Sequence, residues 1–199
     1  MAAPSILVMK LGRTNTRGFT LVELMVVVAI MAVLAIVAVA SYKYYVRRAR
    51  LSEAKSLLQE IKMKQEQYFS TYSQYVSSAS SEATWYPTTN PPMAGGDSDK
   101  ARWDWGKLSC SSPTSATQGW CDLGFRPSDA TYFRFVTVGW NPTKGTTPAP
   151  SSFSIVTSMD FTKRWYYAAA HADFDQNGTY SDFIVTSQTN EVISINEME

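Results

Sequence analysis

Apolar side chains fill the early part of the chain almost without interruption. From Leu24 to Ala40 every residue is Leu, Met, Val, Ala or Ile. A helix rises about 1.5 Å per residue, so residues 19–40 would extend roughly 33 Å, enough for a hydrocarbon core of about 30 Å. Glu23 is the exception, because a carboxylate in such a segment costs on the order of 2.5–3.5 kcal/mol and marks a functional-site candidate. The pattern predicts a transmembrane half-helix over about residues 19–41.

Beyond this run, the spacing of apolar residues changes to steps of three and four, which marks one face of a helix. The stripe consists of Leu51, Ala54, Leu58, Ile61, Gln65, Tyr68, Tyr72 and Tyr75. Charged residues occupy the opposite face, and no proline or glycine occurs between residues 19 and 75. We therefore predict one long helix over residues 19–75, whose second half packs against a sheet. Gln65 is the one residue that breaks the apolar stripe.

Residues 76–130 are rich in Ser, Thr, Pro, Gly and Asp, and we expect a long irregular region there. Asn90-Pro91-Pro92 and Gly95-Gly96-Asp97 are turn signals. Tryptophans argue against simple disorder; the four of this region are Trp85, Trp103, Trp105 and Trp120. They either pack the loop onto the sheet or form an exposed surface for adhesion or subunit contact.

Residues 131–199 carry the strand signals. Bulky groups on both faces of residues 132–139 predict a central strand, and further strands are predicted at 152–159 and 165–172. Residues 183–187 and 191–196 predict a terminal hairpin. One helix packed on four to five antiparallel strands is an α+β fold, in which residues 131–199 form the globular head.

Charge and composition narrow the functional classes. The formal net charge of +1 gives no electrostatic case for bulk nucleic-acid binding, so no specific nucleic acid is expected. The basic residues that follow the apolar run are Lys43, Arg47, Arg48 and Arg50. Three interpretations remain open: these residues lie at the outer edge of a bilayer, pair with acids of neighbouring subunits, or contact phosphate. His171 is the only histidine, and no nucleophile elbow, phosphate loop or zinc spacing occurs, so we expect no enzyme.

The cysteine count is two, Cys110 and Cys121. An even number in an exported chain predicts one disulfide, and its short loop would contribute about 3 kcal/mol in the chain-entropy model. The alternative is a pair of free thiols.

A short acidic stretch near the C-terminus resembles the opening of a calcium loop. Asp173, Asp175 and Asn177 alternate and are followed by a glycine, as oxygen ligands around a hard cation do. The closing acid of an EF-hand falls at Ile184, so Asp182 would have to replace it. Calcium is therefore a possible cofactor and none is required. The alternative is a tight turn between strands, since Asp, Asn and Gly are also turn formers.

The junction Gly18-Phe19-Thr20-Leu21-Val22-Glu23-Leu24-Met25, preceded by the basic residues Lys10, Arg13 and Arg17, resembles the class III signal of type IV pilins and pseudopilins. The resemblance implies a leader, residues 1–18, that a prepilin peptidase removes after Gly18. It also implies N-methylation of Phe19 and a pairing of Glu23 with the amine of a neighbouring subunit. Two alternatives remain: Glu23 reaches toward the interface, or the segment is an ordinary signal anchor or signal peptide.

The same resemblance implies a subunit of a type IV pilus, major or minor, serving motility, adhesion or DNA uptake. Its partners would be other pilin subunits, the prepilin peptidase and an inner-membrane assembly platform. The chain would cross the inner membrane once, with its bulk outside the cytoplasm, before it joins a cell-surface filament. One alternative is a pseudopilin of a type II secretion system, and another is a membrane-tethered, calcium-dependent binding module.

Overall fold

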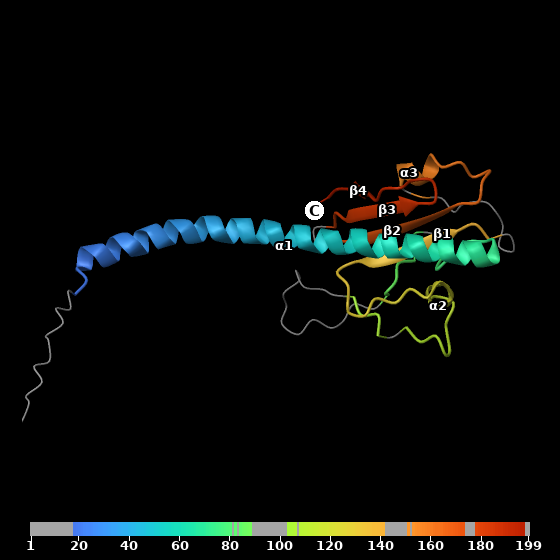
Figure 1. Cartoon of the computed structure of the whole chain (residues 1–199), viewed down its shortest axis with the longest axis horizontal. Coiled ribbons are helices and arrows are strands. Elements are labelled where there is room, and N and C mark those ends of the chain that lie inside the picture. Colours follow the sequence, from blue (N-terminus) through green and yellow to red (C-terminus); the bar gives the residue numbers. More distant parts are fainter. Residues whose placement is uncertain are drawn as a thin grey trace, which may run out of the picture. The chain divides into compact units, whose positions relative to one another are not determined.

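The computed structural model describes residues 18–80, 82, 84–88, 103–106, 108–141, 151, 153–173 and 178–197. By internal contacts the chain divides into two compact units, residues 1–44 and 45–199. The elements in chain order are α1 (Leu21–Tyr72), α2 (Gln118–Leu123), β1 (Arg134–Gly139), α3 (Ser154–Thr157), β2 (Tyr166–Ala172), β3 (Ser181–Thr186) and β4 (Ile193–Ile195) (Figure 1). This is the predicted α+β class, with one long helix and an antiparallel sheet.

Helix α1 is continuous over 52 residues, as the absence of proline and glycine predicts. It stops at Tyr72 because Ser73 adopts a left-handed backbone with φ of 55°. The predicted helix therefore ran three residues too far. Tyr75 is still buried, but from the segment that follows the helix.

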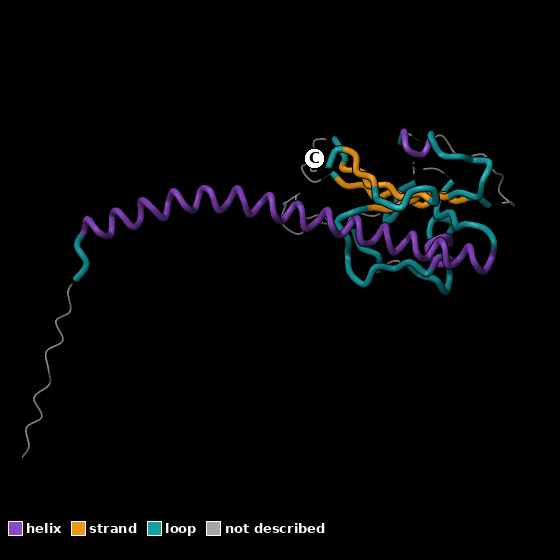
Figure 2. The backbone as a smooth tube through the Cα atoms, turned by 45° about the horizontal axis from the view of Figure 1, so that its top comes forward, coloured by secondary structure: helices purple, strands orange, loops and turns teal. Residues whose placement is uncertain are grey.

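The first core lies between the second half of α1 and one face of the sheet, beside each other in Figures 1 and 2. The helix contributes the predicted stripe, of which Leu51, Ala54, Leu58 and Ile61 are buried. Gln65 is also fully buried, and it is satisfied by three hydrogen bonds. Its Nε2 donates to the Val76 carbonyl (2.8 Å) and to Thr137 Oγ1 (2.9 Å), and its Oε1 accepts from the Val76 N–H (3.0 Å). Gln65, the polar residue that interrupts the stripe, thus lies in the core with its side chain hydrogen-bonded.

The sheet has four antiparallel strands in the order β1-β2-β3-β4. Strand β1 is therefore an edge strand, and its prediction as a central strand was wrong. Both of its faces are nevertheless buried, since Phe135 belongs to the first core and Val136 to a second core on the opposite face. The segment after α1 covers its free edge. Tyr86 exchanges two backbone hydrogen bonds with Phe135, and Ser78 bonds Thr137 through its N–H and its hydroxyl.

A second core covers the opposite face of the sheet and includes Val136, Tyr167 and Ile184. The predicted strand at 152–159 is wrong, because Ser154–Thr157 forms the single helical turn α3. Three apolar side chains of this segment are buried at steps of three, Phe153, Val156 and Met159. That spacing suits one face of a turn of helix better than the alternation of a strand.

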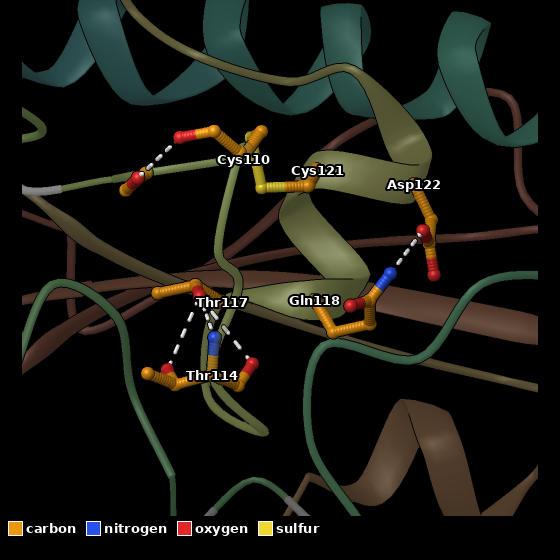
Figure 3. The surroundings of a disulfide bond; sticks show 8 residues. Cys110, Thr114, Thr117, Gln118, Cys121 and Asp122 are labelled. Atoms are coloured by element: carbon orange, nitrogen blue, oxygen red, sulfur yellow. Dashed lines mark hydrogen bonds between the residues drawn. A yellow bond between two sulfur atoms is a disulfide. The ribbon is translucent and has the colours of Figure 1, made fainter.

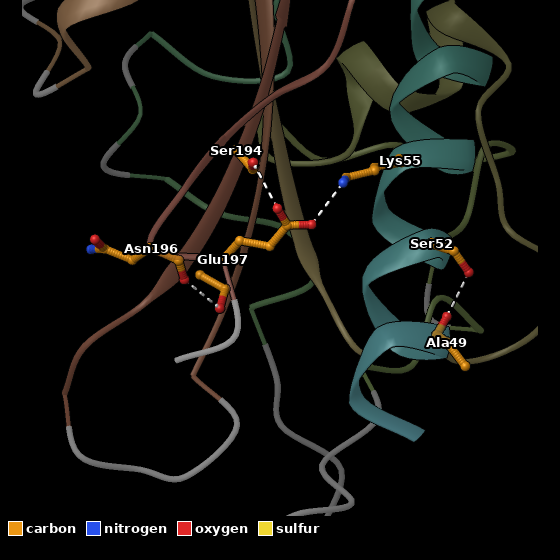
Figure 4. Close-up of polar contacts among 7 residues, drawn as sticks. Ala49, Ser52, Lys55, Ser194, Asn196 and Glu197 are labelled. Atoms are coloured by element: carbon orange, nitrogen blue, oxygen red, sulfur yellow. Dashed lines mark hydrogen bonds and ion pairs between the residues drawn. The ribbon is translucent and has the colours of Figure 1, made fainter. Parts of the chain in front are cut away.

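The C-terminal strand is tied back to α1 by polar contacts (Figure 4). Lys55 Nζ donates to Glu197 Oε1 at 2.7 Å, and Glu197 Oε2 accepts from the hydroxyl of Ser194 at 3.1 Å. Two helical turns later, Lys62 donates to the carbonyl of Thr189 at 2.6 Å. The predicted terminal hairpin is present as β3 and β4, whose register pairs Phe183 with Ser194.

Candidate functional site

The start of α1 is closed by a reciprocal pair of side chains, Thr20 and Glu23. Thr20 Oγ1 accepts from the Glu23 N–H (3.2 Å), and Glu23 Oε2 accepts from the Thr20 N–H (2.9 Å) and hydroxyl (2.7 Å). This is a capping box, which satisfies orphan donors of the first helical turn. The spacing Thr-x-x-Glu is present in the sequence, but the pattern was not used to predict a partner for Glu23 within its own helix.

The residues that precede the capping box are open to solvent. Gly18 and Phe19 lie outside the helix, and Phe19 is 86 % exposed. A side chain added at Gly18 would meet no atom within 4 Å. The Gly18–Phe19 peptide bond is therefore accessible to a processing enzyme. The leader residues Lys10, Arg13 and Arg17 lie outside the described part of the chain.

Within the part of the chain that the structure describes, no segment covers the apolar part of α1. Among the described residues, α1 is the one helix long and apolar enough to cross a membrane. Its most apolar 18-residue window has a mean hydropathy of 3.0, and none of that window is buried. A large exposed apolar surface marks a site of interaction with a membrane or with other protein chains. The helix can thus serve as an anchor, as a packing element between subunits, or as both in turn.

In the second unit, the predicted disulfide joins Cys110 to Cys121, with Cα atoms 5.5 Å apart (Figure 3). Cys121 lies on α2, which ends at Gly124 in a left-handed C-cap with φ of 65°. Gly119 of the same helix packs so closely on the preceding segment that an added Cβ would lie 2.3 Å from the Ser77 carbonyl oxygen. The bridge and this close approach fix α2 in place.

The tryptophans that flank the disulfide are core residues. Trp105 and Trp120 are buried and meet edge to face, with ring centroids 5.4 Å apart. Of the two alternatives from the sequence, packing against the sheet is therefore correct for these two side chains. Trp85 and Trp103 are half-buried, and the predicted turns at 90–92 and 95–97 lie outside the described residues.

The acidic stretch is described only in part. Asp175 and Asn177 lie outside the described residues, whereas an oxygen of Asp173 accepts from the Gly178 N–H at 3.0 Å. Asp182 is 3.0 Å from Nδ1 of His171, whose ring stacks between those of Trp85 and Tyr180. Within the described ranges, no three His, Cys, Asp or Glu side chains are grouped as metal ligands. Calcium binding by Asp173, Asp175, Asn177 and Asp182 stays a prediction.

A small polar cavity of about 90 Å³ lies where the residues that follow α1 meet α2. Tyr75 lines it, and burial, aided by the charge of Glu66, raises the pKa of this phenol to about 12. The Tyr75 side chain is therefore neutral at physiological pH. Sequence reasoning missed this cavity, because its walls come from segments that are far apart along the chain.

Two sequence models of protein families match the chain. The model described as "Prokaryotic N-terminal methylation motif" matches residues 13–39, which include the Gly18–Phe19 bond and Glu23. The model described as "Type IV minor pilin ComP, DNA uptake sequence receptor" matches residues 40–103, which hold the second half of α1 and the segment that covers β1. No curated protein and no solved structure matches the chain significantly.

Proposed function

Because the chain belongs to the type IV pilin family, we propose that it is a minor subunit of a type IV pilus, processed after Gly18 and assembled through its N-terminal helix. One observation carries this proposal. The accessible Gly18–Phe19 bond directly precedes a capped helix, and none of the described residues covers the apolar half of that helix. A precursor that must be cut, held in a membrane and then buried among other helices needs this arrangement.

Cleavage after Gly18 would create an α-amino group on Phe19, one helical turn from Glu23. In the uncut chain the Glu23 carboxylate is bonded by Thr20. On assembly we expect it to pair with the Phe19 amine of a neighbouring subunit in a low-dielectric bundle. A buried pair adds little net stability, but a lone buried charge is costly, so the pair would mainly fix the axial register of the subunits.

Before assembly, the apolar half of α1 would hold the subunit in the inner membrane, with the second unit outside the cytoplasm. Transfer into a filament exchanges lipid for packing against related helices, so it need not be costly. The partners implied are other pilins, the prepilin peptidase and the assembly platform. Energy would come from partner motor proteins, because nothing in this chain resembles a nucleotide site. The minor-pilin match favours this role over the pseudopilin alternative.

A second candidate function is reception of DNA during uptake, and the match of residues 40–103 to a family described as a DNA uptake sequence receptor favours it. The charge of the second unit does not favour DNA binding. Residues 45–199 contain 14 Lys and Arg but 16 Asp and Glu, so the formal net charge of this unit is slightly negative. DNA contact would therefore depend on a local basic surface. An electrophoretic shift of duplex DNA, titrated with salt, would test this function separately.

The test of the proposed function is quantitative mass spectrometry of sheared surface filaments. We expect a peptide that starts at N-methylated Phe19, at a small fraction of the abundance of the main subunit. An abundant peptide would indicate a major pilin, and a peptide confined to the membrane fraction would favour a pseudopilin. A chain with its leader uncut in cells that carry the peptidase would overturn the proposal.

A further inference from the structure

An exposed arginine lies over two aromatic rings at the C-terminal end of α1. Arg164 comes two residues before β2. Its guanidinium carbon is 5.3 Å from the ring centroid of Phe69, in the last turn of α1, and 5.3 Å from that of Trp140, just past β1. Within the described ranges, Arg164 has no hydrogen bond and no ion pair. We call Phe69, Tyr72, Trp140 and Arg164 the arginine surface.

The two rings beside Arg164 are held in place by the fold. The Tyr75 N–H donates to the Trp140 carbonyl at 3.0 Å, and the Trp140 N–H donates to the Trp165 carbonyl at 2.7 Å. The ring of Phe69 stacks on that of Tyr75, with centroids 4.5 Å apart. A cation is attracted to an aromatic face, so the guanidinium has a preferred position before any partner binds. It therefore loses little conformational freedom on binding.

The exposed groups of the arginine surface indicate what it recognises. A guanidinium offers five N–H donors in a planar fork that matches a carboxylate or a phosphate. Tyr72 is 61 % exposed and lies three positions after Phe69, so the two rings are neighbours on α1. Arg, Tyr and Trp are the residue types enriched at the centres of protein interfaces. The surface therefore fits an anionic group that is surrounded by apolar atoms.

The local charge favours a carboxylate over the phosphates of a nucleic acid. Lys163, the cation next to Arg164, is paired with Asp160 at 3.4 Å. Glu66 is close enough that its charge and that of Arg164 act on the same tyrosine. The undescribed stretch between β1 and α3 contains one lysine, Lys144, and no acid. Two acids thus accompany at most three cations, whereas a polyanion is held by several uncompensated cations along its backbone.

We propose that the arginine surface binds a carboxylate on the globular head of a neighbouring pilin, an Asp or Glu flanked by apolar side chains. This inference rests on the proposed function, because other pilins surround a subunit in a filament. Arg164 holds the carboxylate through two parallel N–H···O bonds, and Tyr72 and Trp140 exclude water around them. The contact adds a specific bond between heads to the packing of the N-terminal helices.

The first experiment measures how well variants enter surface filaments of the native cells. The test variants are Arg164→Ala, Arg164→Glu and Arg164→Lys, of which the last keeps the charge but not the planar fork. Lys163→Ala is the matched control, because it removes the adjacent cation, whose side chain is 74 % exposed. For each variant, the amount of the N-methylated Phe19 peptide in sheared filaments is divided by its amount in the membrane fraction.

We expect Arg164→Ala to lower this ratio at least about tenfold, and Arg164→Glu to lower it further, because a charge-assisted bond is lost or replaced by repulsion. Arg164→Lys should lie between Arg164→Ala and the parent chain, and Lys163→Ala should stay within about twofold of the parent. All variants should be cut after Gly18. In detergent, Arg164→Lys should melt at the temperature of the parent, because lysine keeps a cation over both rings.

Two outcomes would overturn the inference and leave the proposed function intact. In one, Arg164→Ala and Arg164→Glu enter filaments as well as the parent chain does. In the other, Lys163→Ala loses as much as Arg164→Ala. A short DNA duplex bound through Arg164, with filament entry unchanged, would assign the surface to nucleic acid instead and overturn the inference as well. A parent chain that is never found in filaments would remove both the proposed function and this inference.

A second experiment identifies the partner group. Tyr72→benzoylphenylalanine is photo-cross-linked in intact filaments, and the joined peptide is identified by mass spectrometry. We expect a peptide from a pilin head that contains Asp or Glu. Replacing that acid with arginine should restore filament entry to Arg164→Glu. A cross-link that reaches no pilin head, or a charge exchange that restores nothing, would contradict the proposal.

Discussion

Gln65 of α1 donates a 2.9 Å hydrogen bond to Thr137 of β1, and both side chains are fully buried. The same glutamine bonds the N–H and the carbonyl of Val76. One side chain therefore joins the helix, the sheet and the segment that connects them. A polar group at the centre of an apolar interface is costly unless all its bonds are made, and here its geometry specifies how α1 lies on the sheet.

Gln65→Ala should lower the free energy of unfolding by about 2–4 kcal/mol, because it leaves polar groups of Val76 unpaired and creates a cavity. Gln59→Ala is the matched control and should change stability by less than about 0.5 kcal/mol. Urea denaturation of the full chain in detergent, followed by tryptophan fluorescence, gives both values. A loss below about 1 kcal/mol for Gln65→Ala would mean that the bond network is not structurally important.

Two substitutions separate the helix cap from the charge of Glu23. Glu23→Gln keeps an oxygen that accepts from the Thr20 N–H but loses the negative charge. If pairing with the Phe19 amine drives assembly, Glu23→Gln should be processed normally and fail to enter filaments. Thr20→Val removes the hydroxyl, keeps the charge, and should reduce incorporation far less.

The measurement is the amount of each variant in sheared filaments relative to the membrane fraction. Equal incorporation of Glu23→Gln and the parent chain would contradict the pairing. A stronger defect in Thr20→Val than in Glu23→Gln would show that the cap, not the charge, is the essential element.

Removal of the disulfide should destabilise the second unit by about 3 kcal/mol. The two cysteines are 11 positions apart, and closing a loop of this length restricts the unfolded chain by about that amount. The variant is Cys110→Ser combined with Cys121→Ser, measured by thermal unfolding. Reductant should lower the melting temperature of the parent chain to that of the double variant and leave the variant unchanged. A reductant-sensitive double variant would show that the loss comes from another cause.

Because of the ion pair between Lys55 and Glu197, the free energy of unfolding should depend slightly on pH in the acidic range. The hydrogen bond from Lys55 holds the pKa of the Glu197 carboxyl below its ordinary value of 4.5. The pair therefore stabilises the folded state above about pH 4.5, and this contribution is lost as pH falls through the lower folded-state value. Both side chains are more than 40 % exposed, so the effect should stay under about 1 kcal/mol.

Glu197→Gln should accordingly lose less stability than the parent chain between about pH 6 and pH 3. Glu191→Gln is the control, because Glu191 is an exposed glutamate of the same region without an ion pair among the described residues. A variant Glu197→Gln with the acid response of the parent chain would show that the pair contributes nothing in solution.

Local periodicity was enough to predict the long helix, with its apolar first half and its amphipathic second half. The same kind of local pattern predicted the terminal hairpin. The positions of Leu51, Ala54, Leu58 and Ile61 specify one helix face whatever the rest of the chain does. The disulfide was equally predictable, since two cysteines have one possible pairing within the chain.

The errors arose where distant segments decide the structure. Strand β1 has apolar side chains on both faces, which resembles a central strand, but its cover comes from Ser78 and Tyr86 far earlier in the sequence. Residues 154–157 are too few for periodicity to distinguish a strand from a helical turn. The capping box of Thr20 and Glu23 could have been predicted from the Thr-x-x-Glu spacing. It was missed because Glu23 was interpreted only as a charge in an apolar segment.

The cover on β1 also limits how molecules of this chain can associate. An uncovered strand would offer a row of free N–H and carbonyl groups to any other chain. On one side of the sheet those groups are already used by Ser78 and Tyr86, and on the other side β4 is three residues long. Asn196, with a positive φ of 50°, ends β4 immediately. Edge-to-edge pairing of the sheets of two such molecules, the contact from which amyloid-like stacking grows, is thereby disfavoured at both edges of the sheet.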